Sequence, residues 1–206
     1  MDTTITDALE YLKKEYHAKL ILLYGSYSLN TQNHESDIDL LVFADIEEPK
    51  HDSKVFDGNM LDAWIYPIKE IENPKEYIHI HPCIIKYDEL TKAEEFVKEI
   101  VRIREEKTIK MSLAEKEQMD RWIIKMIQRG TQDSSESNYR YVWLIYDFPE
   151  LYCKYHGIYY DGPIKTIRYM KEYDKEVYLE YKRLLQNGKD IRRIEELYKR
   201  IEKAYI

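Results

Sequence analysis

The sequence has few cysteines and no long apolar run, and each shortage excludes a class of protein. Only two cysteines, Cys83 and Cys153, occur among its 206 residues, and they lie far apart. A disulfide framework is therefore excluded, and the pair indicates a reducing compartment. No segment reaches the roughly eighteen apolar residues that a membrane-spanning helix needs, and the first residues lack a basic segment followed by an apolar one. We therefore expect a cytoplasmic protein with no membrane partner.

The chain also has fewer basic than acidic residues. The chain has 32 Lys and Arg residues against 39 Asp and Glu residues, which gives a net charge of −7. This balance opposes general attraction to nucleic acid or to an anionic membrane. Nucleic acid is therefore not expected as a partner, whereas a small cationic molecule would be attracted. The apolar content of 44% is sufficient for a packed core in one large domain or two small ones.

The pattern of elements changes near residue 87. Before it, apolar runs typical of strands accompany an amphipathic helix over residues 5–16 and a short helix that begins at Ser26. Beyond it, helical periodicity dominates, and Ser112 with Glu115 forms a predicted capping box. The sequence therefore predicts an α+β fold. A mixed β-sheet flanked by helices is expected in residues 1–87, and an α-helical bundle in residues 88–206.

Three further segments carry weaker local signals. Residues 44–53 are charged and contain Pro49, so a loop or a ragged helix is expected there. The prolines that follow Tyr66 predict an irregular region that extends to the boundary. The first helix of the bundle is expected to begin at Glu89, with Asp88 as its cap.

The chemistry of the chain is concentrated in residues 21–43. There, an apolar run leads into Gly25 and Ser26, and a second apolar run opens with two aspartates. Because successive side chains of a strand point to opposite faces, we expect Asp37 and Asp39 on one face of a central strand over residues 37–43. Two neighbouring carboxylates repel each other unless a cation lies between them. The pair therefore suits a divalent, oxygen-seeking ion such as magnesium.

The turn before this strand suits an anion. Gly25 permits an unusual φ and lets a bulky anion approach the backbone. A helix that begins at Ser26 would direct free N–H groups at that anion. Each of these short motifs is common by itself. A phosphate-binding turn one loop before a metal-binding aspartate pair is far rarer.

A third carboxylate is predicted on a β-hairpin. Asp57 and Gly58 favour a tight turn between residues 54–56 and residues 59–66. In the second arm, Asp62 shares a strand face with apolar side chains, which is costly unless the carboxylate is paired or binds a metal. If this arm pairs beside residues 37–43, Asp62 joins the two earlier aspartates. A two-metal phosphoryl transfer site usually needs such a third carboxylate.

These residues together resemble a known family. The resemblance rests on Gly25 and Ser26, nine intervening residues, the run Ser36-Asp37-Ile38-Asp39-Leu40, and Asp62 on a later strand. The pattern is similar to that of the nucleotidyltransferase superfamily, which includes DNA polymerase β and the aminoglycoside nucleotidyltransferases. It covers residues 15–68, and the helical remainder is similar in layout to the C-terminal bundles of small-molecule nucleotidyltransferases. Asn30 stands where many members have glycine, and asparagine tolerates the left-handed backbone region comparatively well.

The resemblance implies a role for each residue of the pattern. Gly25 and Ser26 would hold the β- and γ-phosphates of a nucleoside triphosphate, expected to be ATP. Asp37 and Asp39 would coordinate two magnesium ions. Asp62 would bind the metal nearer the acceptor, and would either take the proton of the attacking hydroxyl or help the metal to lower its pKa. The hydroxyl would then attack the α-phosphorus, and pyrophosphate would leave.

Some roles stay open from the sequence alone. Ser36 either hydrogen-bonds a phosphate or caps its loop. Lys165, near a predicted helix start, either reaches the triphosphate, as the resemblance implies, or is a solvated surface lysine. The aromatic residues of the helical half either line an acceptor pocket or form core: Tyr139, Tyr141, Trp143, Tyr159 and Tyr160.

Three functions remain in competition. The first is transfer of AMP from ATP to a small hydroxylated molecule such as an aminoglycoside-like antibiotic, which would confer antibiotic resistance. The second is transfer to a protein or tRNA, as in toxin and antitoxin members of the superfamily. The composition shows an excess of acidic residues and no basic surface, which argues against tRNA but not against a protein. The third is a catalytically silent nucleotide-binding module, which would have little reason to keep three like charges together.

Overall fold

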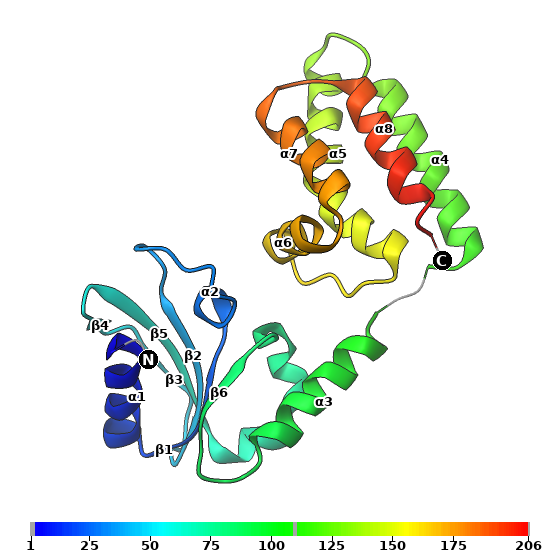
Figure 1. The fold of residues 1–206 in the computed structure, drawn as a ribbon. Coiled ribbons are helices and arrows are strands. Elements are labelled where there is room, and N and C mark those ends of the chain that lie inside the picture. Colours follow the sequence, from blue (N-terminus) through cyan, green and yellow to red (C-terminus); the bar gives the residue numbers. More distant parts are fainter. Residues whose placement is uncertain (1–2, 109–110, 206) are drawn as a thin grey trace. The chain divides into compact units, whose positions relative to one another are not determined.

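The chain folds into two compact units. The structure is a computed structural model, and it describes residues 3–108 and 111–205. The units divide between Arg104 and Glu105. The first unit contains the sheet and the second is helical (Figure 1). None of the helices in the described ranges is long and apolar enough to cross a membrane.

The first unit is built on a mixed β-sheet. Across the described residues the sheet has six strands in the order β3-β5-β2-β1-β6, with β4 paired to β5 outside this path. β2 pairs antiparallel with β1 and parallel with β5, so it lies at the centre, as expected. The strands are β1 (Ala18–Leu23), β2 (Ile38–Ala44), β3 (Lys50–Asp52), β4 (Val55–Phe56), β5 (Asn59–Pro67) and β6 (Ile84–Asp88).

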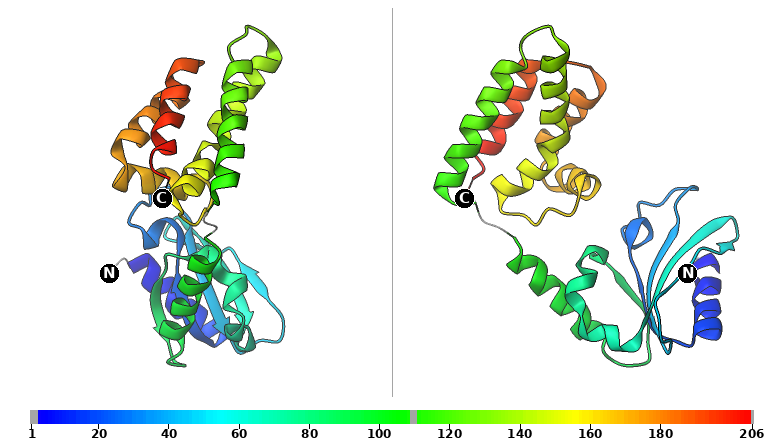
Figure 2. Two further views of the ribbon diagram at one scale, coloured as in Figure 1. Left: turned by 90° about the vertical axis from the view of Figure 1, so that its right-hand side faces the viewer. Right: turned by 180° about the vertical axis from the view of Figure 1, so that it is seen from behind.

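Helices cover both faces of this sheet (Figures 1 and 2). On one face, α1 packs on a cluster that includes Ile38, Leu40 and Val42. On the other, the 3₁₀ helices and α3 pack on a cluster that includes Leu41 and Phe43. The alternate side chains of β2 are thus buried on opposite faces, which explains its continuous apolar run. The helical elements are α1 (Thr3–Tyr16), α2 (Gly25–Ser28), η1 (Ile68–Glu72), η2 (Pro74–Ile80) and α3 (Ala93–Glu106).

Three segments of the first unit differ from the sequence prediction. β3 lies in the segment expected to be a loop or ragged helix, and β6 ends the region expected to be irregular. Both are edge strands, which need no long apolar run because only one side pairs. The first helix after residue 87 begins at Ala93 rather than at Glu89. The Asp88 carboxylate explains this delay, since it accepts hydrogen bonds from the backbone N–H groups of Leu90, Lys92 and Ala93.

The unit boundary also lies further along the chain than the predicted division after residue 87. Ala93, Phe96 and Ile100 of α3 are buried in the cluster beneath the sheet. This burial attaches α3 to the first unit, although the sequence pattern of α3 is typical of the helices that follow.

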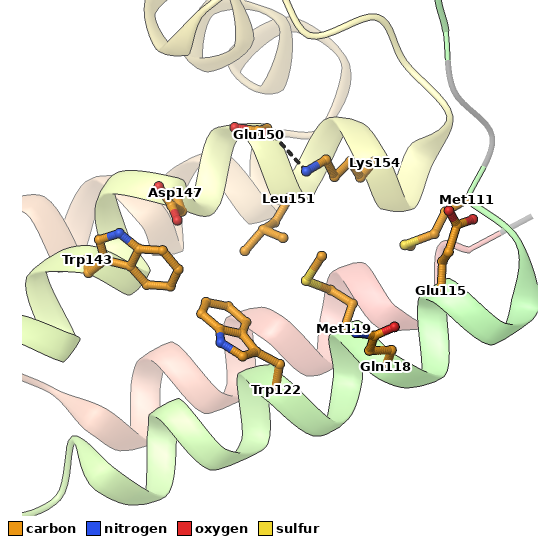
Figure 3. Close-up of a pocket in the computed structure, with 10 residues that line it drawn as sticks. All are labelled: Met111, Glu115, Gln118, Met119, Trp122, Trp143, Asp147, Glu150, Leu151 and Lys154. Atoms are coloured by element: carbon orange, nitrogen blue, oxygen red, sulfur yellow. Dashed lines mark ion pairs between the residues drawn. The ribbon is translucent and has the colours of Figure 1, made fainter.

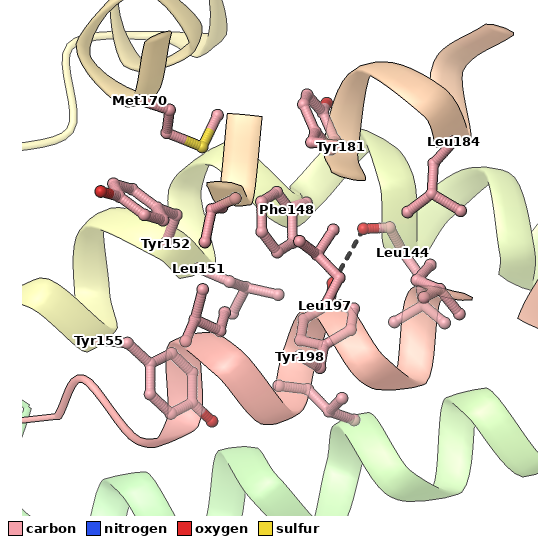
Figure 4. Packing of buried hydrophobic residues seen from close by; sticks show 14 of the residues in the cluster. Leu144, Phe148, Leu151, Tyr152, Tyr155, Met170, Tyr181, Leu184, Leu197 and Tyr198 are labelled. Atoms are coloured by element: carbon pink, nitrogen blue, oxygen red, sulfur yellow. Dashed lines mark hydrogen bonds between the residues drawn. The ribbon is translucent and has the colours of Figure 1, made fainter. Parts of the chain in front are cut away.

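The second unit is a helical bundle with its own core (Figure 4). At its centre, the Phe148 ring stacks on Tyr181 at 4.9 Å and meets Tyr198 edge-on at 5.5 Å. The Tyr198 hydroxyl donates a hydrogen bond of 2.9 Å to the Leu144 carbonyl. The predicted capping box of Ser112 and Glu115 is present. The helices are α4 (Leu113–Arg129), α5 (Ser135–His156), α6 (Pro163–Tyr173), α7 (Lys175–Gln186) and α8 (Ile191–Glu202).

Candidate functional site

Two neighbouring strands bring Asp39 and Asp62 together. In the parallel pairing of β2 with β5, Asp39 is in direct register with Asp62. Registered residues of adjacent strands point to the same face, so the two carboxylates lie side by side. Both side chains are partly buried, while Asp37 is exposed one residue before β2 begins. The sequence predicted that Asp62 would join the other two aspartates if its strand paired beside residues 37–43. This pairing is present.

The carboxylate of Asp39 is affected by the charges of both other aspartates. The pKa of Asp39 rises from 3.8 to about 6. Burial is the largest cause, followed by the negative charges of Asp62 and then Asp37. The backbone N–H of Ser26 donates a hydrogen bond to Asp39 and acts in the opposite direction. A cation placed among these carboxylates would relieve the repulsion that raises this pKa.

The turn at Gly25 lies directly against Asp39. Gly25 has a φ of +67°, and a Cβ added there would overlap with Oδ2 of Asp39. Both the left-handed backbone and the close approach therefore require glycine at this position. The backbone N–H of Tyr24 donates a hydrogen bond of 3.0 Å to the Asp39 carbonyl, which fixes the turn to β2. Asn30, after the short helix α2, adopts a φ of +53° as expected for a residue in place of glycine.

The structure places Ser36 within its own loop. The Ser36 hydroxyl accepts a hydrogen bond of 2.9 Å from the Asn33 backbone N–H. The Ser36 backbone N–H in turn donates to the Asn33 carbonyl at 3.1 Å. These bonds are those of a loop cap, and contact with a phosphate stays a prediction.

Lys165 lies in the second unit, on the first turns of α6. Its ammonium group forms an ion pair of 2.6 Å with the Asp161 carboxylate. Its contact with a triphosphate also stays a prediction. Of the five aromatic residues singled out in this half, Tyr141 is buried in the core and Tyr139 is 71% exposed. Tyr160 packs against the core, and Tyr159 is partly exposed. Trp143 lines a hollow between α4 and α5.

Two residues beside the aspartates were missed from the sequence. His51 on β3 has its Nε2 2.6 Å from Oδ1 of Asp62, and its ring stacks on Trp64 at 4.5 Å. Tyr24 directly precedes the glycine turn, and burial with the charges of Asp39 and Asp62 raises the pKa of its phenol. Tyr24 could have been noticed from its place beside Gly25. His51 could not, because its strand has no recognisable pattern.

The donor set has the chemistry of a divalent cation site. In residues 3–108 and 111–205, no three or more His, Cys, Asp or Glu side chains are grouped so that they could hold a metal ion. The donors of Asp37, Asp39 and Asp62 are nevertheless all carboxylate oxygens, which hard cations such as magnesium prefer. Their mutual repulsion at Asp39 gives such a cation a favourable place. These three residues are the ones that would hold it.

Comparison with known proteins establishes the family. The model of the family described as "Nucleotidyltransferase domain" matches residues 5–133, which is more than half of the chain. The chain therefore belongs to the nucleotidyltransferase domain family, and nucleotidyl transfer is the class of activity that this membership supports. The resemblance noted in the sequence is confirmed at this level.

The other comparisons add little. No curated protein matches the chain. Among solved structures, the nucleotidyltransferase-like protein from Exiguobacterium sibiricum 255-15 aligns with 98% of this chain and 73% of its own. The identity is 16% and the TM-score is 0.36, a likeness too low to support an argument about function.

Proposed function

We propose that the chain transfers a nucleoside monophosphate, AMP from ATP, to a hydroxyl group of a small molecule and releases pyrophosphate. The observation that carries the proposal is the register of Asp39 with Asp62 on adjacent parallel strands, beside the turn at Gly25. The net charge of −7 favours a cationic acceptor of the aminoglycoside type. Membership of the family supports the transfer of a nucleotide, and the choice of ATP and of this acceptor is our inference.

Each residue of the site has a part in this reaction. Magnesium ions, when held by Asp37, Asp39 and Asp62, supply charge neutralisation for the triphosphate and for the developing pyrophosphate. Gly25 leaves the backbone open to the phosphates because it has no side chain. Ser26 orients the Asp39 carboxylate through its backbone N–H. The acceptor oxygen forms a bond with the α-phosphorus while the bond from that phosphorus to the bridging oxygen breaks.

Asp62 is the proposed base of the reaction. His51 contacts its Oδ1, which leaves Oδ2 to receive the proton of the attacking hydroxyl. A base must lie within hydrogen-bond reach of the proton that it takes. The Asp62 side chain is 35% exposed, which is compatible with an acceptor arriving from solvent.

The test uses ATP labelled on its α-phosphate, magnesium, and a panel of aminoglycosides and other small polyols. We expect label in one or more small acceptors, and a loss of at least about a hundredfold for Asp39→Asn and Asp62→Asn, as when charge stabilisation is removed from a transition state. The matched control is Asp57→Asn, which makes the same change at a hairpin turn that accepts asparagine.

The location of the label decides between the competing functions. Label in no small molecule but in a protein or tRNA fraction of a cell lysate would assign the acceptor to a macromolecule. ATP binding without transfer to any acceptor would favour a silent nucleotide-binding module. Either result would reject the small-molecule acceptor while leaving the nucleotide site intact.

A further inference from the structure

Helices α4 and α5 border a hollow of about 590 Å³ that lies wholly within the helical unit (Figure 3). Its volume falls inside the range of roughly 300 to 1,000 Å³ that is typical of small-molecule sites. Figure 3 shows Trp122 and Met119 pointing from α4 toward Trp143 and Leu151 of α5. None of these residues belongs to the aspartate site on the sheet.

The wall of the hollow presents aromatic and thioether surface. The rings of Trp122 and Trp143 meet edge-on, with 4.6 Å between their centroids and 74° between their planes. Both tryptophans are partly exposed, so ring surface remains available to a ligand. Indole faces attract organic cations, and a methionine such as Met119 adapts its shape to an apolar body.

The charges around this wall are mostly negative. Glu115, Asp147 and Glu150 line the hollow, and Lys154 is the basic residue among its lining residues. Lys154 is already in an ion pair of 2.7 Å with Glu150. Among the described residues, no hydrogen bond or ion pair is formed by the Asp147 carboxylate. Burial and then the charge of Glu150 raise the pKa of Asp147, and the charge of Lys154 acts in the opposite direction. The net rise means that an additional positive charge beside this carboxylate would be favoured.

We propose that this hollow binds an organic monocation with an apolar body. The body lies against Trp122, Trp143 and Met119, and the cationic group pairs with Asp147. The charge of the site and its aromatic wall select this class of ligand over neutral and anionic molecules of the same shape. The inference is independent of nucleotidyl transfer, since it uses no residue of the sheet.

Tryptophan fluorescence offers a direct test. The chain has three tryptophans, and two of them line the hollow. Trp64→Phe therefore leaves only the two reporters at the site. The probes are phenylbutylamine, phenylbutanol and phenylbutyrate, which share one body and differ in charge. Without nucleotide or metal, we expect saturable binding that is about tenfold tighter for the amine than for the alcohol, as for a hydrogen bond to a charged group, and weakest for the carboxylate.

A charge-removing variant then assigns the cation to its partner. In the same Trp64→Phe background, Asp147→Asn is expected to bring the amine to the affinity of the alcohol, while binding of the alcohol changes less than about twofold. Glu117→Gln is the matched control, since Glu117 is an exposed acid of α4 outside the hollow. It should leave the amine preference unchanged. Circular dichroism confirms that each variant is folded.

If Asp147→Asn does not fold, Trp122→Leu gives a second reading of the same site. It removes one aromatic wall, and should weaken the amine about fivefold, as the loss of one cation–π contact predicts. Three results would overturn the proposal: no saturable signal with any probe, equal affinity for amine and alcohol in the parent protein, or an amine preference that survives in folded Asp147→Asn. Failure of nucleotidyl transfer would leave this test unaffected.

Discussion

Burial, neighbouring negative charges and a backbone hydrogen bond all affect the ionisation of Asp39. Its carboxylate is partly buried, lies beside the charges of Asp62 and Asp37, and receives the backbone N–H of Ser26. In the absence of a cation, these neighbours make its ionised form unfavourable in the folded protein. The ionised Asp39 carboxylate therefore destabilises the folded state. Such local destabilisation is common at functional sites.

The first prediction concerns the stability of metal-free Asp39→Asn. The folded protein holds the Asp39 proton with a pKa of about 6, against 3.8 for an unperturbed aspartate. Ionisation therefore destabilises the fold as the pH rises through this interval, and the penalty is complete above about pH 6. Asparagine removes the penalty, so we expect a gain of about 1 to 2 kcal/mol near pH 8 after allowance for solvent screening. Urea unfolding of the parent protein and the variant, at about pH 4 and near pH 8, measures this difference in the free energy of unfolding.

The gain from Asp39→Asn should vanish below about pH 4, where the carboxyl group is protonated in both states. Asp57→Asn provides the control, because it makes the same substitution at the turn between β4 and β5 rather than at the aspartate site. Added magnesium should stabilise the parent protein and not Asp39→Asn, because binding to the folded state alone raises stability. An equal gain at high and low pH would contradict the electrostatic cause.

The second prediction concerns His51 as a positioning residue. Its Nε2 lies 2.6 Å from Oδ1 of Asp62, so it holds the orientation of that carboxylate. We expect His51→Ala to lower kcat by tenfold to a hundredfold, which is typical of lost outer contacts to a catalytic carboxylate. The KM for ATP should change less than about twofold. His51→Gln should recover part of the activity because its amide can donate to Asp62.

His34→Ala is the matched control for this substitution, since the His34 side chain is 89% exposed and its ion pair is with Glu35 rather than with Asp62. Steady-state kinetics and the unfolding midpoint are measured for each variant. A loss of activity that follows the loss of stability, or that appears equally in His34→Ala, would reduce His51 to a structural role.

At the scale of elements, the site depends on how β2, β5 and the turn before β2 are joined. β2 and β5 are parallel and in register at the aspartates, so neither strand can shift by one residue without separating the carboxylates. The turn at Gly25 then packs on Asp39 with no room for a side chain. Three separate segments must therefore hold their positions together for one site to form.

The third prediction compares two glycines with similar backbones. Gly25 and Gly58 have φ values of +67° and +85°, but only Gly25 would place a Cβ against Asp39. Each substitution to alanine should cost about 1 kcal/mol of stability from backbone strain. Gly25→Ala should in addition displace Asp39 and abolish measurable transfer, whereas Gly58→Ala should retain it. Denaturant unfolding and the labelled-ATP assay separate the two effects, and equal activity in both variants would contradict the close approach.

At the scale of the whole molecule, each cluster of buried residues in the described part of the chain lies within one of the two units. The two clusters on the faces of the sheet contain residues up to Ile100, and the helical cluster begins at Met111. The core of the bundle thus stabilises the second unit, and the two clusters on the sheet stabilise the first.

The fourth prediction tests this separation with Phe148→Ala. Phe148 is fully buried against Tyr181 and Tyr198, so its loss should destabilise the helical unit by about 3 to 5 kcal/mol. Hydrogen exchange followed by mass spectrometry should show faster exchange in α5 and α8, and little change in β1 and β2. Tyr146→Ala on the same helix is the control, because Tyr146 is 71% exposed. Equal loss of protection in both units would contradict independent cores.

Local patterns in the sequence determined much of this protein. The apolar run of β2 places it in the middle of a sheet, and Asp57 with Gly58 defines the hairpin, because each signal depends only on neighbouring residues. The capping box at Ser112 likewise marks the start of α4. The motif around Gly25, Asp37 and Asp39 was also sufficient to identify the family, which the comparison confirmed.

Only the tertiary structure decided which strands pair and which side chains come into contact through that pairing. The edge strands β3 and β6 have short, mixed sequences, and their conformation depends on a partner strand distant in the chain. The contact between His51 and Asp62 follows from such a pairing, so no local pattern could reveal it. The sequence by itself predicted the aspartates and the glycine turn of the candidate site, because side-chain type and spacing are local. The register that sets Asp39 beside Asp62 was decided by the sheet, because strand pairing is a long-range interaction.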